Sequence, residues 1–190
     1  MRRFSSLSFL ILAWAAILAP GAGVAHPDAK PKPAAKVTKA AKAAKAPPPE
    51  SVGIFGDWQA ATHTEAGETI CYAFSRPKSS DPALASRGDV VLTVTERAKL
   101  RDTVALSAGF DYPAKAIPSV SVDGKKFELY TSGRSAFARD GTALIAAFGK
   151  GSDAVFTSPA AKGKVVTDHF SLKGFGAAMR AVLVICPGPG

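Results

Sequence analysis

Apolar and polar positions alternate along much of the chain beyond residue 50, and this period of two predicts a sheet. Residues 90–96 (VVLTVTE) are rich in β-branched side chains, and residues 103–107 (TVALS) alternate again after a charged turn. Residues 120–122 and 126–130 flank the pair Asp123-Gly124. Both residues of that pair suit the positive φ angles of a type I′ turn, so the sequence predicts a β-hairpin there.

Further along the chain two helices interrupt the alternation. After Asp140-Gly141 the apolar residues recur at helical spacing and two glycines then supply a stop, which predicts a short helix. Strands are expected at 154–157 and 164–170, joined by a turn that contains Pro159 and Gly163. Ser171 is expected to cap a terminal helix that runs to about residue 185. The apolar side of that helix is expected to carry Phe175, Met179, Val182 and Leu183.

These elements indicate one mainly β domain over residues 51–190. The expected architecture is a β-sandwich or a partly open antiparallel barrel with one or two short helices, including a C-terminal helix. The 140 positions suffice for one sizeable hydrophobic core and are too few for two ordinary domains.

Residues 1–25 have the pattern of a secretory signal peptide. Arg2 and Arg3 precede the apolar run FLILAWAAIL, and Gly23-Val24-Ala25 offers small residues for cleavage after Ala25. A membrane anchor is the alternative, but the uncharged run is about half of the roughly 20 residues that a bilayer requires. We therefore expect an exported protein with no transmembrane span in its mature form, located in the periplasm, secreted, or associated with the cell surface.

Residues 26–50 form an Ala/Lys/Pro-rich linker with six lysines and no aromatic residue. Such a segment buries too little apolar surface to offset its ordering entropy, so we expect it to be disordered. It is interpreted either as a solvated linker or as a cationic arm that makes weak contacts with anionic envelope polymers. The formal net charge of +9 leaves only +3 on residues 51–190, which argues against a nucleic-acid-binding stripe on the domain.

The two cysteines, Cys71 and Cys186, are expected to form a structural disulfide. An even count in an exported chain, with one cysteine toward each end of the domain, favours a bridge between the first strand region and the C-terminus. A free reactive thiol or a metal pair is the alternative. Neither cysteine lies in a Cys-x-x-Cys context, and no histidine lies close to either in the sequence.

Several segments together resemble the invasion-associated locus B (IalB) family of exported bacterial envelope proteins. The resemblance covers residues 53–186 and is carried by Phe55-Gly56-Asp57-Trp58, VSVDGKKFELY at 120–130, AFARD at 136–140 and VVTDHFSLKGFGAA at 165–178. It implies a small β-rich periplasmic or surface-associated domain without known catalytic activity and, in pathogenic members, an association with host-cell entry. Members typically place a cysteine shortly after Gly-Asp-Trp, whereas this chain has Ala60 and Ala61 there.

The sequence offers little catalytic chemistry of its own. Asp168, His169 and Ser171 superficially suggest an acid, a base and a nucleophile, but strand neighbours point to opposite faces. We expect His169 at the surface or a strand end and Asp168 beside the start of the terminal helix. With only His63 as a further domain histidine, no catalytic residue, cofactor site or metal site is assigned.

Two further sequence features are interpreted as structural. Gly149-Lys150-Gly151 departs from a phosphate-binding loop and fits a helix stop better. Aromatic residues of the domain are expected to pack mostly in the core, namely Trp58, Phe127, Phe137, Phe170 and Phe175.

Two functional hypotheses follow. The first is a non-catalytic envelope interaction protein whose domain contacts an envelope or host-surface protein. The alternative is a small periplasmic hydrolase or carbohydrate-modifying enzyme, which requires Asp168, His169 or another carboxylate such as Asp57 to converge in one cleft.

Overall fold

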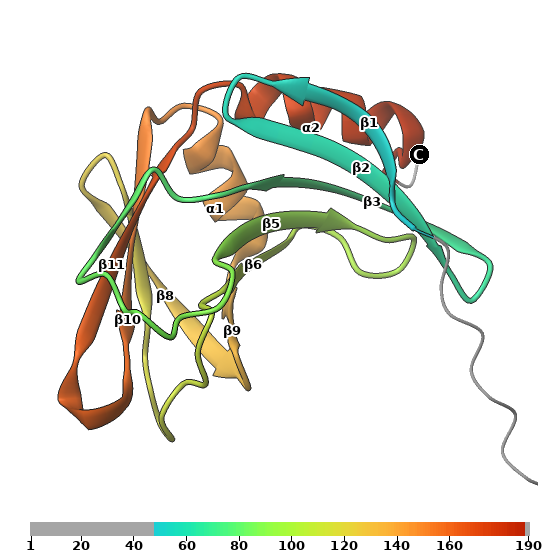
Figure 1. Ribbon diagram of the computed structural model, residues 1–190. Coiled ribbons are helices and arrows are strands. Elements are labelled where there is room, and N and C mark those ends of the chain that lie inside the picture. Colours follow the sequence, from blue (N-terminus) through green and yellow to red (C-terminus); the bar gives the residue numbers. More distant parts are fainter. Residues whose placement is uncertain (1–47, 189–190) are drawn as a thin grey trace, which may run out of the picture. The chain divides into compact units, whose positions relative to one another are not determined.

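A computed structural model describes residues 48–188 of the chain, and these residues build one strongly bent antiparallel sheet with two α-helices (Figure 1). The signal peptide and nearly all of the Ala/Lys/Pro-rich linker lie outside the described residues. Eleven strands follow the spatial order β1-β2-β3-β5-β6-β9-β8-β7-β10-β11-β4. Because β1 and β4 are edges that do not pair with each other, the sheet stays open. The mainly β, partly open antiparallel architecture is thus confirmed, rather than a sandwich of two separate sheets.

The strands in chain order are β1 (Glu50–Phe55), β2 (Trp58–Glu65), β3 (Glu68–Ser75), β4 (Ser79–Asp81), β5 (Val91–Glu96), β6 (Thr103–Ser107), β7 (Ser119–Val122), β8 (Lys125–Ser132), β9 (Ser135–Ala138), β10 (Asp153–Pro159) and β11 (Val165–Ser171). The helices are α1 (Gly141–Phe148) and α2 (Phe175–Ile185), with a short 3-10 turn at Ala161–Gly163.

The hairpin predicted around Asp123-Gly124 is present as β7 and β8. Asp123 has a φ angle of 45° and Gly124 one of 89°, so both turn residues take the positive φ that a type I′ turn needs. The predicted short helix is α1, in which the Asp140 side chain caps the N-terminus by accepting from the Ala143 N–H. Gly149 ends this helix, so its interpretation as part of a helix stop is confirmed.

The terminal helix was predicted with the wrong cap and one wrong core residue. Gly174, with a φ angle of 93°, is the N-cap of α2, while Ser171 still belongs to β11. A side chain at position 174 has no room because a Cβ there would lie 1.8 Å from the Phe55 carbonyl oxygen. Leu183 is 42% exposed and not on the buried side, which holds Phe175, Ala178, Met179 and Val182.

One face of the sheet forms the core together with both helices. Trp58 is fully buried, and the centroid of its ring lies 4.8 Å from that of Phe175 on α2 and 6.4 Å from that of Phe148 on α1. The Trp58 indole N–H donates to the Ser171 carbonyl at 3.0 Å, which satisfies its polar atom. Helix α2 lies over β1, β2 and β3, as Figure 1 shows. The opposite face of these central strands carries neither helix.

Candidate functional site

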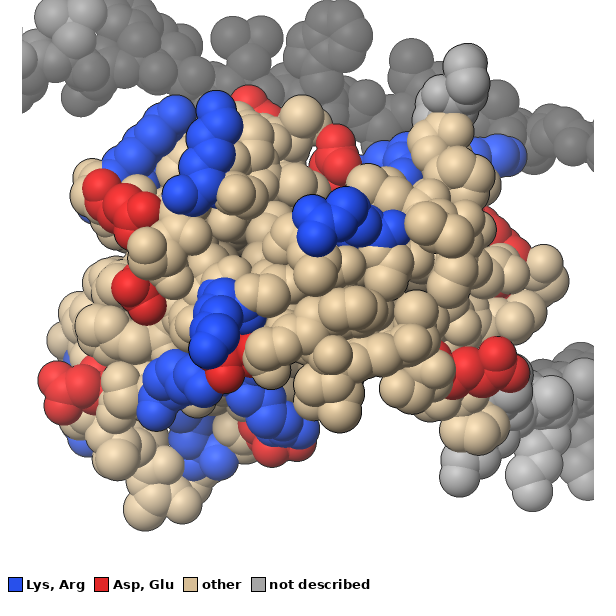
Figure 2. Space-filling view, turned by 90° about the horizontal axis from the view of Figure 1, so that it is seen from above, with Lys and Arg blue, Asp and Glu red and all other residues tan. Residues whose placement is uncertain are grey.

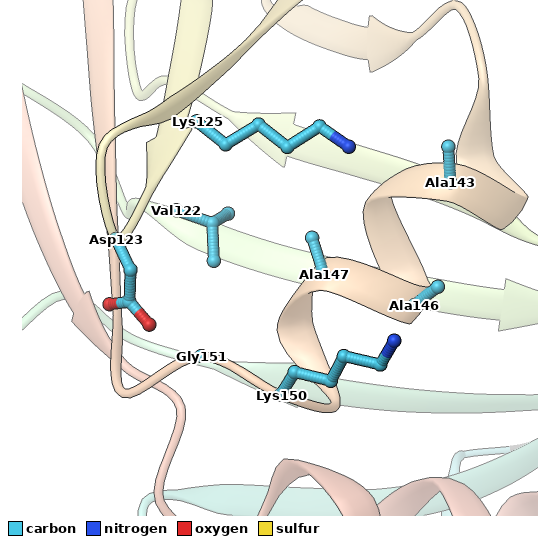
Figure 3. A pocket seen from close by; sticks show the side chains of 8 residues that line it. All are labelled: Val122, Asp123, Lys125, Ala143, Ala146, Ala147, Lys150 and Gly151. Carbon is cyan, nitrogen blue, oxygen red and sulfur yellow. The ribbon is translucent and has the colours of Figure 1, made fainter.

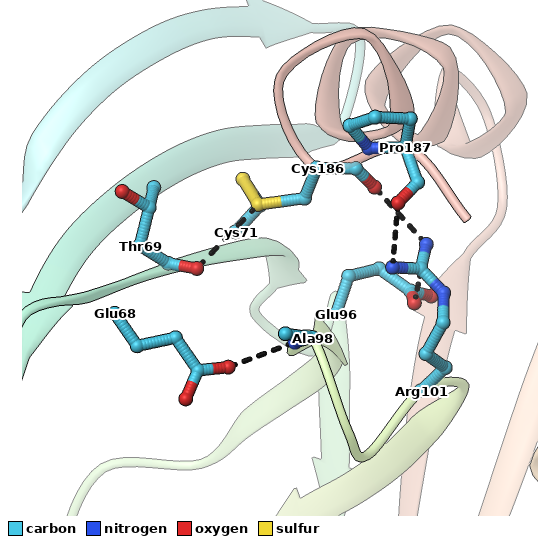
Figure 4. The surroundings of a disulfide bond; sticks show 8 residues. All are labelled: Glu68, Thr69, Cys71, Glu96, Ala98, Arg101, Cys186 and Pro187. Carbon is cyan, nitrogen blue, oxygen red and sulfur yellow. Dashed lines mark hydrogen bonds and ion pairs between the residues drawn. A yellow bond between two sulfur atoms is a disulfide. The ribbon is translucent and has the colours of Figure 1, made fainter. Parts of the chain in front are cut away.

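The disulfide between Cys71 and Cys186 is present in the structure, with the Cα atoms 6.1 Å apart. It joins the third strand, β3, and not the first, to the end of α2 (Figure 4). Arg101 reinforces this connection because its guanidinium donates to the carbonyls of Cys186 at 3.0 Å and Pro187 at 3.2 Å. The surroundings therefore indicate a structural bridge.

Glu96 is a buried carboxylate directly beside this bridge. It pairs with Cys71 in the β3–β5 register, is fully buried, and forms an ion pair with Arg101 at 2.9 Å. Burial raises the pKa of the Glu96 carboxyl above its ordinary value, while the Asp102 N–H and the Arg101 charge oppose that shift less strongly. Its Oε1 atom has no hydrogen-bond partner among the described residues. Its ion pair with Arg101, which itself holds the Cys186 carbonyl, indicates a role in holding the C-terminal segment.

Asp168 does not lie beside the start of the terminal helix as expected. It is fully buried on β11 and receives two hydrogen bonds from Arg87, each of 2.7 Å, and a third from the Ser80 hydroxyl at 2.6 Å. Arg87 also donates to the Ala108 carbonyl and lies over the Phe110 ring. With its oxygens engaged in this way, Asp168 holds loops against the sheet and is poorly placed to act as an acid or base.

The three residues that suggested a triad do not converge. His169 is exposed on β11, on the face opposite Asp168 and Phe170, so its expected surface position is confirmed. Ser171 accepts a local hydrogen bond from the Lys173 N–H at 3.2 Å. Asp57 lies in the β1–β2 turn and pairs with Lys78, which lowers the pKa of the Asp57 carboxyl, with Ser171 contributing. Within residues 48–188 no group of three or more metal-binding side chains occurs.

A surface cavity of about 290 Å³ lies beside α1 (Figure 3). Lys125 and Lys150 extend along either side of its alanine-lined floor. Lys150 follows the C-terminus of α1, where a cation complements the exposed helix carbonyls, and Asp123 accepts from the Ser152 N–H at 3.1 Å. Both lysines are exposed, so this cavity offers weak electrostatic contacts only.

The face of the domain on the α2 side carries acidic and basic side chains interspersed, as Figure 2 shows.

The sheet face that carries neither helix is the strongest candidate for recognition. It presents the side chains of His63 on β2, Tyr72 and Phe74 on β3, Phe137 on β9 and Tyr130 on β8, here called the aromatic face. Tyr130 is 45% exposed and stacks on Phe137, with 5.5 Å between the ring centroids. The centroid of the Tyr72 ring lies 5.6 Å from that of His63 and 5.8 Å from that of Phe74. The other four members are half-buried, and partly exposed aromatic side chains that gather on one face are typical of interaction surfaces.

Phe137 was wrongly expected in the core. Its neighbours Ala136 and, across the hairpin, Leu129 face the core, and the alternation turns Phe137 to the other side. Trp58, Phe170 and Phe175 are buried as predicted, and Phe127 packs against the core at its margin. The strand alternation carries a signal for the aromatic face. Along each strand, these aromatic residues alternate with the buried aliphatic residues and therefore point to the opposite side of the sheet.

Comparison with known proteins identifies a family and a similar solved structure. A sequence model described as "Invasion associated locus B (IalB) protein" matches residues 58–183. A search of curated proteins gives no match. The crystal structure of invasion associated protein b from Bartonella henselae is similar, with 15% sequence identity and a TM-score of 0.49, covering 70% of this chain and 95% of that chain. None of the helices in residues 48–188 combines the length and apolar character needed to cross a membrane.

Proposed function

Because the chain belongs to the invasion associated locus B family, we propose that it is an exported, non-catalytic protein that recognises a component of the cell envelope or of a host surface. The observation that carries this proposal is the aromatic face, a set of partly exposed rings on strands whose other side is packed into the core. Aromatic side chains have few rotatable bonds, so little side-chain entropy is lost when a partner covers them.

The buried polar groups support binding rather than catalysis. Asp168 and Glu96 are the two fully buried acidic residues in the described part of the chain, and each forms an ion pair with an arginine. A general acid or base needs to reach a substrate proton, whereas these carboxylates are closed off from solvent. Neither of these two buried carboxylates therefore supplies the accessible acid or base that the enzymatic alternative requires.

Export to the periplasm, the cell surface or the medium is part of the same proposal. The sequence pattern of residues 1–25 favours a signal peptide, and a disulfide is typical of oxidising compartments. The lysines of residues 26–47 are proposed to add weak contacts with anionic envelope polymers. Since the family is named for invasion, we include contact with host cells as the setting for this recognition in pathogenic members.

Retention on isolated envelopes tests the proposal. Three proteins are compared: the mature chain from residue 26, the same chain with its six linker lysines changed to glutamine, and residues 26–50 fused to an unrelated soluble carrier. We expect the first two to be retained at physiological ionic strength and the fusion to wash off, because exposed charges are screened beyond about 8 Å. Retention of the fusion together with loss of the lysine-free chain would place recognition in the linker and contradict the proposal.

A further inference from the structure

Little apolar packing holds the end of α2 beyond Val182. That residue is the last fully buried one of the helix. The three residues after it are 42%, 82% and 44% exposed, namely Leu183, Val184 and Ile185. Cys186 follows as the C-cap and is half-buried. The position of its sulfur therefore depends on the contacts that fasten the helix end.

Arg101 fastens this helix end through atoms that take no part in the disulfide. Its guanidinium donates to the carbonyls of Cys186 at 3.0 Å and Pro187 at 3.2 Å (Figure 4). The same group forms the ion pair with the buried Glu96 at 2.9 Å. Because an arginine side chain carries five donors in a fixed fork, it can hold a carboxylate and two carbonyls at once. Glu96 and Arg101 are here called the C-terminal clamp.

The loop that carries Arg101 is itself fixed by contacts on either side of this residue. The Ala98 N–H donates to the Glu68 carboxylate on β3 at 2.8 Å, as Figure 4 also shows. The Thr142 hydroxyl of α1 donates to the Asp102 carboxylate at 2.6 Å. Neither contact involves α2 or a cysteine. The support for the clamp therefore does not depend on the bond between the two sulfurs.

The two cysteines are held in place by different means. Cys71 is fully buried within β3 and is the register partner of Glu96 on β5, so the sheet fixes its position. Cys186 lies at a helix end that the clamp holds through its carbonyl. Two groups that are held close together react as if each were present at a high effective concentration. The clamp is the device that supplies this proximity on the Cys186 side.

We propose that the C-terminal clamp is a template for the disulfide: it holds Cys186 opposite Cys71 while both thiols are free, so that the bridge closes and, once opened, closes again. Glu96 and Arg101 are thus positioning residues for a redox reaction of the chain itself. This inference goes beyond the proposed function and does not depend on which surface component the domain recognises. With glutathione disulfide as the oxidant, closure joins the two cysteine sulfurs. The two electrons and two protons that they give up appear in two molecules of reduced glutathione.

Equilibration with glutathione tests the template. The mature chain from residue 26 is brought to equilibrium with mixtures of reduced and oxidised glutathione at neutral pH, free thiols are trapped, and mass spectrometry gives the bridged fraction. The result is the effective concentration of the thiol pair. We expect Glu96→Leu/Arg101→Met to lower it about tenfold, which is about 1.4 kcal/mol and the net contribution of about one hydrogen bond to a charged group. The double change leaves no buried charge without a partner.

Two further variants sharpen the comparison. Arg97→Met is the matched control, because Arg97 lies in the same loop but pairs with Glu65 and not with the helix end. It is expected to leave the effective concentration unchanged. Arg101→Lys keeps a positive charge beside Glu96 but lacks the fork that holds two carbonyls, and it is expected to lower the effective concentration about threefold. Circular dichroism of the reduced proteins shows which are folded, and Arg101→Lys decides the matter if the double variant does not fold.

Hydrogen exchange of the reduced proteins separates a template from a general loss of stability. The Cys186 N–H donates to the Val182 carbonyl at 2.9 Å. We expect this amide to stay protected in the reduced parent and to exchange about tenfold faster in Glu96→Leu/Arg101→Met, in proportion to the lost effective concentration. General destabilisation would instead accelerate the most protected amides of the sheet by the same factor.

Three results would overturn the template. The first is an equal effective concentration in the parent, Arg101→Lys and the double variant. The second is an amide of Cys186 that exchanges as fast in the reduced parent as in the double variant. The third is a loss in Arg97→Met as large as that in the double variant. None of these results contradicts the proposed function, which the retention of the bridged protein on isolated envelopes tests separately.

Discussion

Arg87 and Asp168 form a two-pronged ion pair inside the folded unit. Each guanidinium Nη atom lies 2.7 Å from a different carboxylate oxygen, and the side chains are only 6% and 0% exposed. Arg87 comes from the loop between β4 and β5, whereas Asp168 comes from β11, 81 residues later. This contact ties a long loop to the sheet, and it accounts for the polar residue that interrupts the buried positions of β11.

Removing one member of the pair is expected to cost far more than removing both. Asp168→Leu leaves a buried, unpartnered guanidinium and is expected to lower the free energy of unfolding by about 3–5 kcal/mol. The double variant Arg87→Met/Asp168→Leu is expected to recover most of that loss, because no buried charge remains without a partner. Urea unfolding measures both values, and a double variant less stable than Asp168→Leu alone would contradict this account.

The disulfide is expected to contribute a large part of the stability. Cys71 and Cys186 are 115 positions apart, and for a loop of this length the chain-entropy relation gives about 4–5 kcal/mol, an upper figure for most measured bridges. Cys71→Ala/Cys186→Ala should therefore lower the free energy of unfolding by about 2–5 kcal/mol. Under reducing conditions, the free energy of unfolding of the parent should fall toward that of the variant, and the value for the variant should stay unchanged. Equal stability of parent and variant in oxidising buffer would show that the bridge is dispensable.

Two glycines with similar φ angles provide a matched test of steric fit. Gly124 and Gly174 have φ angles of 89° and 93°, but only at Gly174 would an added Cβ meet backbone atoms. Gly124→Ala is expected to cost about 1–2 kcal/mol from backbone strain alone. Gly174→Ala is expected to cost clearly more, because the junction between the β1–β2 turn and α2 has to move. Thermal unfolding compares the two, and equal losses would mean that this junction yields readily.

Glu96 makes stability depend on pH in a defined direction. Because burial raises its pKa above the ordinary 4.5, the folded protein retains a proton over a pH range in which the unfolded chain has released it. The free energy of unfolding should therefore fall as pH rises from about 4.5 through the raised pKa of this carboxyl. Glu96→Gln should remove this component of the slope in urea titrations between about pH 4 and 7. Glu128→Gln, at an exposed position on β8, should leave it in place, and a stability difference between parent and Glu96→Gln that rises with pH would refute the assignment.

His169 is expected to be unimportant for any chemistry. Its side chain is exposed on the face opposite Asp168, so His169→Ala should leave unfolding and envelope retention unchanged. Assays with ester and glycan substrates provide the check. Turnover by the parent protein that this substitution abolishes would favour the enzymatic alternative over the proposed function.

Much of the fold could be predicted because its signals are local. Residues 103–107 alternate in polarity, and the structure has β6 at the same residues. Asp123-Gly124 marks a turn that neighbouring residues alone favour, and the glycine after Phe148 ends α1 where the helical period stops. The start of α2 was misplaced because Gly174 is required by the distant Phe55 carbonyl, a contact that no local pattern encodes.

The candidate site could be predicted only in part. The pairing of two cysteines followed from their count, since a pair of cysteines in an oxidising compartment has a single possible intramolecular partner each. The burial of Asp168 was missed because its partner Arg87 is remote in sequence, and only tertiary contact compensates the desolvation of a charge. The aromatic face was missed because each ring, taken singly, is typical of a core residue.

The amino-acid sequence by itself determined the strand and turn pattern, the family and the two cysteines available for a bridge, all of which depend on residue types and short spacings. Tertiary structure decided which strands became neighbours, and thereby which side chains share a surface. Phe74 and Phe137 lie in one row because β3, β5, β6 and β9 are adjacent, although 63 positions separate them in the chain. A binding surface on a sheet is set by register between strands, and register arises only when the whole core packs.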